Sequence, residues 1–170
     1  SVTDTDVIAR LTKDIQGMKG FEDVQVSRGY MGNVEIKSTN KSIDRSRIKG
    51  IIDGMLSSDD RVALQNAGLF QMRGMDDETV VKSLSSHYGQ ISEQFKSDAE
   101  TYDRASKTTA DISIRDKEHL IQLKDHSLAK KAAYDKYVSD ITNGYNIGTF
   151  DREGLIGNFW ADKIGEQFSR

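Results

Sequence analysis

The sequence contains neither proline nor cysteine in its 170 residues, although average usage would give roughly eight prolines. Proline interrupts helices, and its cis/trans isomerisation slows folding, so a chain without it can form long helices and refold without that delay. The absence of cysteine excludes disulfides, thiolate metal ligands and cysteine nucleophiles. Neither absence indicates what the protein acts on.

Charge and hydropathy exclude some classes of partner. The 24 basic and 27 acidic residues give a net charge of −3, which argues against binding to nucleic acid or anionic lipid through bulk attraction. No apolar run approaches the length of a membrane span, and the opening residues lack the basic-then-apolar order of a signal peptide. We expect a soluble protein that is cytoplasmic or is translocated without a classical signal peptide.

The first of three predicted parts, residues 1–75, begins with a short amphipathic helix that Thr3 or Thr5 caps. Its apolar residues share one face, and glycine residues mark its end. Valine and isoleucine then alternate with polar residues on both sides of a connection that contains glycine. This pattern predicts a two-stranded β-hairpin with Tyr30 and Met31 at its tip.

Two shorter helices complete this first part. Apolar residues at helical spacing predict the first of them from about Ser42. The second is expected to begin at Ser58 or Asp59, to bury Val62 and Leu64, and to end near Gly68.

The second part, residues 76–143, has the pattern of two long helices. Asp98 interrupts a heptad-like seam on the first helix, either as a polar contact or because the seam leaves the core there. The second helix, from about Asp111 to Thr142, has an apolar stripe wide enough for more than one neighbour. Residues 106–109 favour a turn without enforcing it, and one continuous helix is the alternative. The seam residues of the first helix are Val81, Leu84, Tyr88, Ile91, Phe95, Tyr102 and Ala105.

The third part, residues 144–170, is predicted to be one amphipathic helix after a break at Gly144 and Gly148. Its face contains the only tryptophan of the chain, Trp160. This helix either closes the core or docks on a partner or a membrane surface. Together the three parts predict one domain, residues 1–170, with a mainly α (α+β) fold. The fold is a helical bundle with two long antiparallel helices, a small N-terminal β-hairpin and an amphipathic C-terminal helix.

Few residues have the spacing of a catalytic or metal site. Asp116 and His119 resemble half of a carboxylate–histidine pair, but no second pair accompanies them, so we expect no metal and no cofactor. The segment from Asp140 to Asp151 does not fit a calcium loop, because Tyr145 stands where glycine is needed and Asp151 stands in place of the final glutamate. An enzyme is one alternative function, and its site would lie around a polar group on the second long helix. That group consists of Glu118, His119, Asp125 and His126.

Two basic clusters make a nucleic-acid-binding module the other alternative. Both are interspersed with aspartate, which is typical of an ordinary soluble surface. The first cluster consists of Lys37, Lys41, Arg45, Arg47 and Lys49, and the second of Lys124, Lys130, Lys131 and Lys136.

The interpretation that we favour is a non-enzymatic helical protein that acts through contacts with another protein or with its own copies. The missing proline and cysteine would suit a translocated bacterial effector or a phage component. The surfaces expected to contact a partner are the hairpin tip and the last helix. Their candidate residues are Tyr30, Met31, Phe159, Trp160 and Phe168.

A chain without proline should refold without a slow phase that depends on prolyl isomerisation. We expect dilution from denaturant to restore the far-UV circular dichroism signal in a stopped-flow experiment, and added prolyl isomerase to leave the rate unchanged. A phase lasting tens of seconds, or failure to refold, would count against a chain adapted to translocation.

Overall fold

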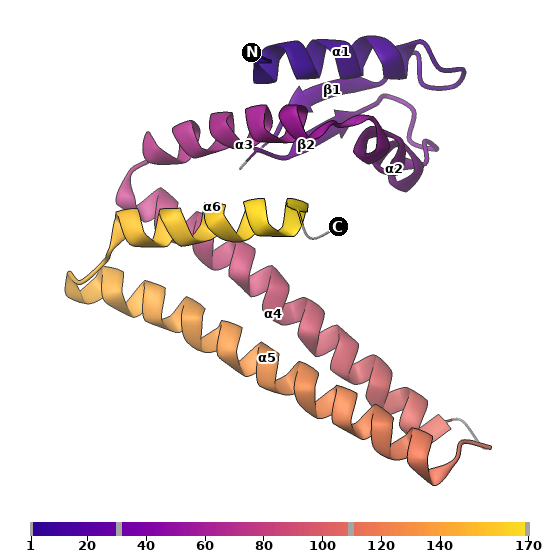
Figure 1. The fold of residues 1–170 in the computed structure, drawn as a ribbon, viewed down its shortest axis with the longest axis vertical. Helices are drawn as coiled ribbons and strands as arrows, with labels where there is room; N and C mark the ends of the chain where they lie inside the picture. Colours follow the sequence, from indigo (N-terminus) through magenta and orange to yellow (C-terminus); the bar gives the residue numbers. More distant parts are fainter. Residues whose placement is uncertain (1, 30–31, 109–110, 169–170) are drawn as a thin grey trace. The chain divides into compact units, whose positions relative to one another are not determined.

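The computed structural model describes residues 2–29, 32–108 and 111–168, with residues 164–168 described by their backbone alone. This part of the chain is mainly helical, with six helices and one two-stranded antiparallel sheet, as the sequence predicts (Figure 1). The chain divides into two compact units. The first unit comprises Ser1–Met75 and Glu153–Arg170, and the second comprises Asp76–Arg152.

The predicted elements appear in order, and the last helix groups with the N-terminal part of the chain. The elements of the first unit are α1 (Asp4–Gln16), β1 (Gln25–Arg28), β2 (Val34–Lys37), α2 (Arg45–Met55), α3 (Ser58–Arg73) and most of α6 (Arg152–Phe168). The second unit consists of α4 (Asp77–Thr108) and α5 (Ile114–Ile147). None of the helices in the described part of the chain combines the length and apolar character that a bilayer crossing requires.

The core of the first unit forms where α1 packs on the β-hairpin (Figure 1). Thr3 caps α1 in a capping box with Asp6, so the helix begins where the sequence predicts. Val26 and Ile36 are paired across the two strands and are both buried. The core residues recur at the helical and strand spacings of the sequence. They are Val7, Leu11, Ile15, Phe21, Val24, Val26, Ile36, Ile48, Ile52 and Leu64.

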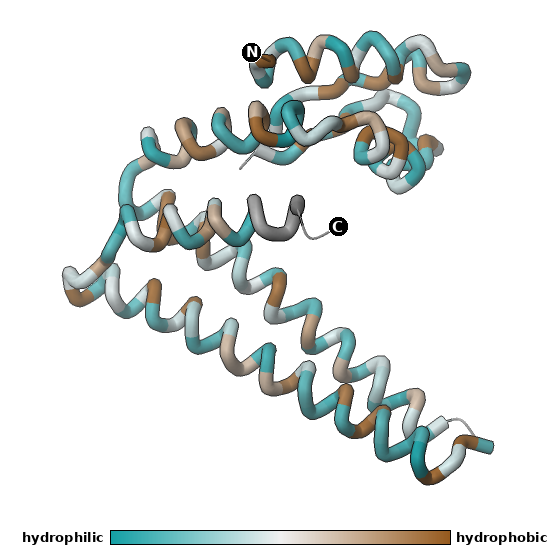
Figure 2. Tube along the Cα trace, in the orientation of Figure 1, coloured by the Kyte–Doolittle hydropathy of each residue, from teal (hydrophilic) through white to brown (hydrophobic). Residues whose placement is uncertain are grey.

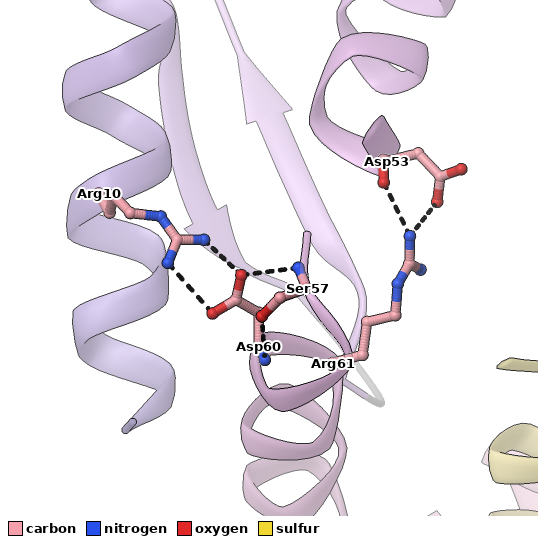
Figure 3. Close-up of polar contacts among 5 residues, drawn as sticks. All are labelled: Arg10, Asp53, Ser57, Asp60 and Arg61. Atoms are coloured by element: carbon pink, nitrogen blue, oxygen red, sulfur yellow. Dashed lines mark hydrogen bonds and ion pairs between the residues drawn. The ribbon is translucent and has the colours of Figure 1, made fainter. Parts of the chain in front are cut away.

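The first turn of α3 forms hydrogen bonds with α1 and with α2 (Figure 3). Asp60 is buried, and it accepts two hydrogen bonds from the Arg10 guanidinium of α1, at 3.1 and 2.5 Å. The same carboxylate accepts the backbone N–H of Ser57 at 2.9 Å, which completes a capping box. The next residue, Arg61, donates to the carbonyl and the carboxylate of Asp53 at the end of α2.

One predicted helix end is wrong: α3 does not end near Gly68 but continues to Arg73. The glycine is buried where the ring of Trp160 approaches, and a Cβ built on it would lie 2.5 Å from that ring and 2.7 Å from the backbone nitrogen of Gly32. It therefore serves close packing rather than termination. Val62, which was expected to be buried, is 39% exposed, whereas Leu64 is buried as expected.

The second unit is a hairpin of two long helices that run side by side in opposite directions (Figure 1). Ser113 caps a new helix with its side chain, so the two segments are separate helices and not one continuous helix. The predicted break at Gly144 is wrong: α5 continues to Ile147 and ends at Gly148. Gly148 has a φ of +81°, which suits the left-handed C-cap, whereas Gly144 is tolerated within the helix.

Replacing Asp60 should change how stability depends on pH. Hydrogen bonds from Arg10 lower the pKa of Asp60 to about 2, against 3.8 for the ordinary carboxyl. The carboxylate therefore stabilises the fold above pH 3.8, and this contribution, about 2 kcal/mol, is lost as pH falls from 4 towards 2. We expect Asp60→Asn to lose that amount at pH 7 and to show a flatter acid-unfolding curve by circular dichroism. Asp53→Asn, in an exposed pair with Arg61, should cost less than about 1 kcal/mol; an equal loss in both variants would contradict this account.

Gly68→Ala should destabilise the first unit although alanine favours helices, because the added methyl group would meet the Trp160 ring and the Gly32 backbone. We expect a loss of about 1–3 kcal/mol in urea unfolding followed by tryptophan fluorescence. Gly54→Ala is the matched control. It lies in α2 with no atom within 4 Å of the added Cβ, and it should stabilise the protein by about 0.5–1 kcal/mol. A neutral or stabilising Gly68→Ala would show that the close approach of Trp160 and Gly32 to Gly68 does not contribute to stability.

Candidate functional site

Aromatic rings hold the two helices of the hairpin together. Tyr88 of α4 lies edge-on to Tyr137 of α5, with ring centroids 4.7 Å apart, and parallel to Tyr134 at 6.1 Å. Phe95 stacks on the other side of this cluster, 5.8 Å from Tyr134. Offset and edge-to-face pairs of this kind add about 0.5–1.5 kcal/mol each beyond their buried area. The contact between α4 and α5 is therefore centred on these four rings.

Beyond Tyr88, the seam of α4 keeps the predicted Phe95 but departs from the predicted positions on either side of it. The residues that α4 buries are Ser92, Ala99 and Ser106, each one position after the predicted Ile91, Asp98 and Ala105. Small side chains at a seam allow two helices to approach closely, and hydropathy alone does not identify serine as a seam residue. Asp98 lies beside the seam and accepts a hydrogen bond from Gln94 of its own helix.

Charged groups also contribute to the hairpin contact. Lys124 of α5 donates to Asp103 of α4 at 2.9 Å, and Lys107 donates to the same carboxylate at 3.0 Å. These bonds, with that of Lys124 the strongest, lower the pKa of Asp103. Asp135 accepts from Lys131 and from the Ser92 hydroxyl, which likewise lowers its pKa. Lys124 and Lys131 are thereby held along the edge of the hairpin contact.

One apolar stripe of α5 is only partly covered by the described part of the chain. Ile114, Ile121 and Leu128 are 79%, 42% and 41% exposed, and they recur every seven residues. Seven residues are nearly two helical turns, so the three side chains lie along one face of the helix. The next position of this row is Asp135, where the apolar stripe ends. We call Ile114, Ile121 and Leu128 the α5 stripe and take it as the candidate functional site.

The hydropathy of the hairpin agrees with this assignment. Hydrophobic residues recur along the full length of α4 and α5 (Figure 2). A helix needs one apolar face for each neighbour, and the sequence predicts a stripe on α5 wide enough for more than one. Among the described residues of the second unit, α4 is the one helix that packs on α5, and the α5 stripe is left exposed together with Tyr145 and Ile147 at the C-terminal end of α5.

The residues predicted to contact a partner are not those of the α5 stripe. Tyr30 and Met31 lie outside the described residues, as does the side chain of Phe168. Phe159 and Trp160 are buried in the chain itself, with their rings edge to face at 5.1 Å. Their role in contacting a partner stays a prediction, but in this conformation neither ring offers a surface.

The four polar residues of the alternative enzyme hypothesis all lie on α5. Glu118, His119, Asp125 and His126 are all exposed on α5. A shallow hollow on the second unit contains none of them, and its lining residues are Ser86, Gly89, Gln90, Glu93 and Gln94 of α4. Among the described residues, no three histidine or carboxylate side chains are grouped as metal ligands.

Contacts within the chain engage several residues of the two basic clusters. Arg45 donates to the Ile36 carbonyl at 2.7 Å, and the Arg47 guanidinium lies 5.6 Å from the centre of the Phe21 ring. In the second cluster, three lysines are paired with aspartates of the hairpin. These contacts reduce the positive charge available to a phosphate backbone.

Phe70 of α3 is an exposed residue that the sequence reasoning missed. It is 83% exposed, more than any other large hydrophobic residue described. Single exposed apolar residues are common on soluble proteins, whereas the α5 stripe is a row of three.

No family model, no curated protein and no solved structure matches this chain.

Proposed function

We propose that this chain is a non-enzymatic structural or interaction protein that binds other protein chains, its own copies included, through the α5 stripe. The observation that supports the proposal is the exposed row of Ile114, Ile121 and Leu128. Anchors at i, i+7 and i+14 form one of the two apolar rows by which an amphipathic helix packs along a second helix.

Energetics favour covering this row. Full burial of an isoleucine or leucine side chain contributes about 1.5–3 kcal/mol relative to leaving it exposed. Ile121 and Leu128 are already more than half covered, so each can gain only part of that amount, whereas Ile114 can gain most of it. A standard interface buries about 800 Å² on each partner, far more than three side chains provide. The contact should therefore be weak and dependent on concentration.

The biological setting that we propose is a translocated bacterial effector or a phage component. The absence of proline and cysteine supports it, because such a chain can cross a channel unfolded and recover its helices quickly. A coiled-coil-like pairing of helices would then assemble at the destination without disulfides.

Sedimentation over a range of concentrations tests the stripe. We expect the wild type to associate reversibly, and Ile121→Lys combined with Leu128→Lys to weaken that association at least about tenfold, because both anchors would then bury a charge. The matched control is Gln122→Lys with Ala129→Lys, which adds the same charges one residue along on exposed positions of α5. It should associate like the wild type, and circular dichroism should show all three folded. A wild type that is monomeric at several hundred micromolar, or a stripe variant that associates normally, would overturn the proposal.

A further inference from the structure

Charged residues flank the α5 stripe in two rows of opposite sign. On one side lie Lys117, Lys124 and Lys131, three residues after Ile114, Ile121 and Leu128 respectively. On the other side lie Glu118 and Asp125, four residues after Ile114 and Ile121. Successive residues of an α-helix are about 100° apart, so these offsets place the lysine row and the acidic row on opposite edges of the stripe.

The two rows differ in their surroundings within the hairpin. The lysine row borders α4, where Lys124 is paired with Asp103 and Lys131 with Asp135 of its own helix. These pairs offset part of the charge of Lys124 and Lys131, whose side chains are still 34% and 26% exposed, and Lys117 is exposed too. Glu118 and Asp125, on the edge away from the lysine row, are both exposed.

This pattern is complementary to itself in one orientation only. When two copies of α5 face each other in parallel about a two-fold axis, the lysine edge of each copy meets the acidic edge of the other. In an antiparallel pair, lysines would meet lysines and carboxylates would meet carboxylates, and this repulsion would oppose association. We infer that the occupant of the α5 stripe is a second copy of this chain, whose α5 helix packs parallel to the first and in register.

This inference rests on the proposed function and makes it more specific. In the parallel pair, Ile114, Ile121 and Leu128 each lie opposite the same residue of the partner copy. In an antiparallel pair centred on Ile121, Ile114 would lie opposite Leu128, because both are seven residues from Ile121. Single cysteines can distinguish the two orientations, and the chain has no cysteine of its own to interfere.

The experiment uses the full chain with Ile114→Cys or Leu128→Cys, oxidised mildly at a concentration where sedimentation shows association. We expect each variant alone to form a disulfide-linked dimer on a non-reducing gel. Ala129→Cys, on an exposed position one residue beyond the stripe, should cross-link far more slowly. Cross-linking only when Ile114→Cys and Leu128→Cys are mixed would establish an antiparallel pair and overturn the inference, while the proposed function would stand.

Charge reversal gives an independent readout that does not depend on disulfide geometry. Glu118→Lys with Asp125→Lys makes both edges of the stripe basic, so self-association at low salt should weaken about tenfold, and added salt should reduce the difference. In an antiparallel pair the same change exchanges one repulsion for another and leaves the affinity nearly unaltered. Unaltered affinity would therefore overturn the inference. Absence of wild-type association would overturn both this inference and the proposed function.

Discussion

Two helices packed side by side can cover only one face of each other, and this constraint governs the second unit of the protein. The contact between α4 and α5 includes the rings of Tyr88, Phe95, Tyr134 and Tyr137, and small residues such as Ser92 and Ala99 are buried beside them. A hairpin of this kind has no interior beyond that seam. Any further apolar row on α5 is left at the surface, and the α5 stripe is such a row.

The helices of the first unit are held together by a buried carboxylate rather than by a cluster of aromatic rings. These helices are short, and they are joined through the first turn of α3, where Asp60 accepts hydrogen bonds from Arg10 while also capping its own helix. A carboxylate this deeply buried depends on all of these donors, because an unpaired buried charge is costly. The glycine at position 68 then allows Trp160 of the last helix to approach α3 closely.

The charged residues of the hairpin have two distinct roles. Asp103 and Asp135 hold Lys124 and Lys131 along the contact with α4, so these lysines contribute to the fold before they can contribute to a partner. Glu118 and Asp125 have no such place in the hairpin seam and lie exposed. The α5 stripe therefore has lysines along one edge and carboxylates along the other. We infer from these opposite charges the orientation of a second copy.

Local signals in the sequence determined where most elements begin and what class they belong to: the Thr3 cap, the valine and isoleucine alternation of the hairpin, and the heptad spacing beyond Val81. They also showed that α5 has an apolar face wider than one neighbour requires. Only the tertiary structure decided that the seam passes through Ser92 and Ala99, that Gly68 is a packing position, and that the α5 stripe is left exposed. The reason is that hydropathy and caps act over one or two helical turns, whereas burial depends on which distant face arrives to cover a residue.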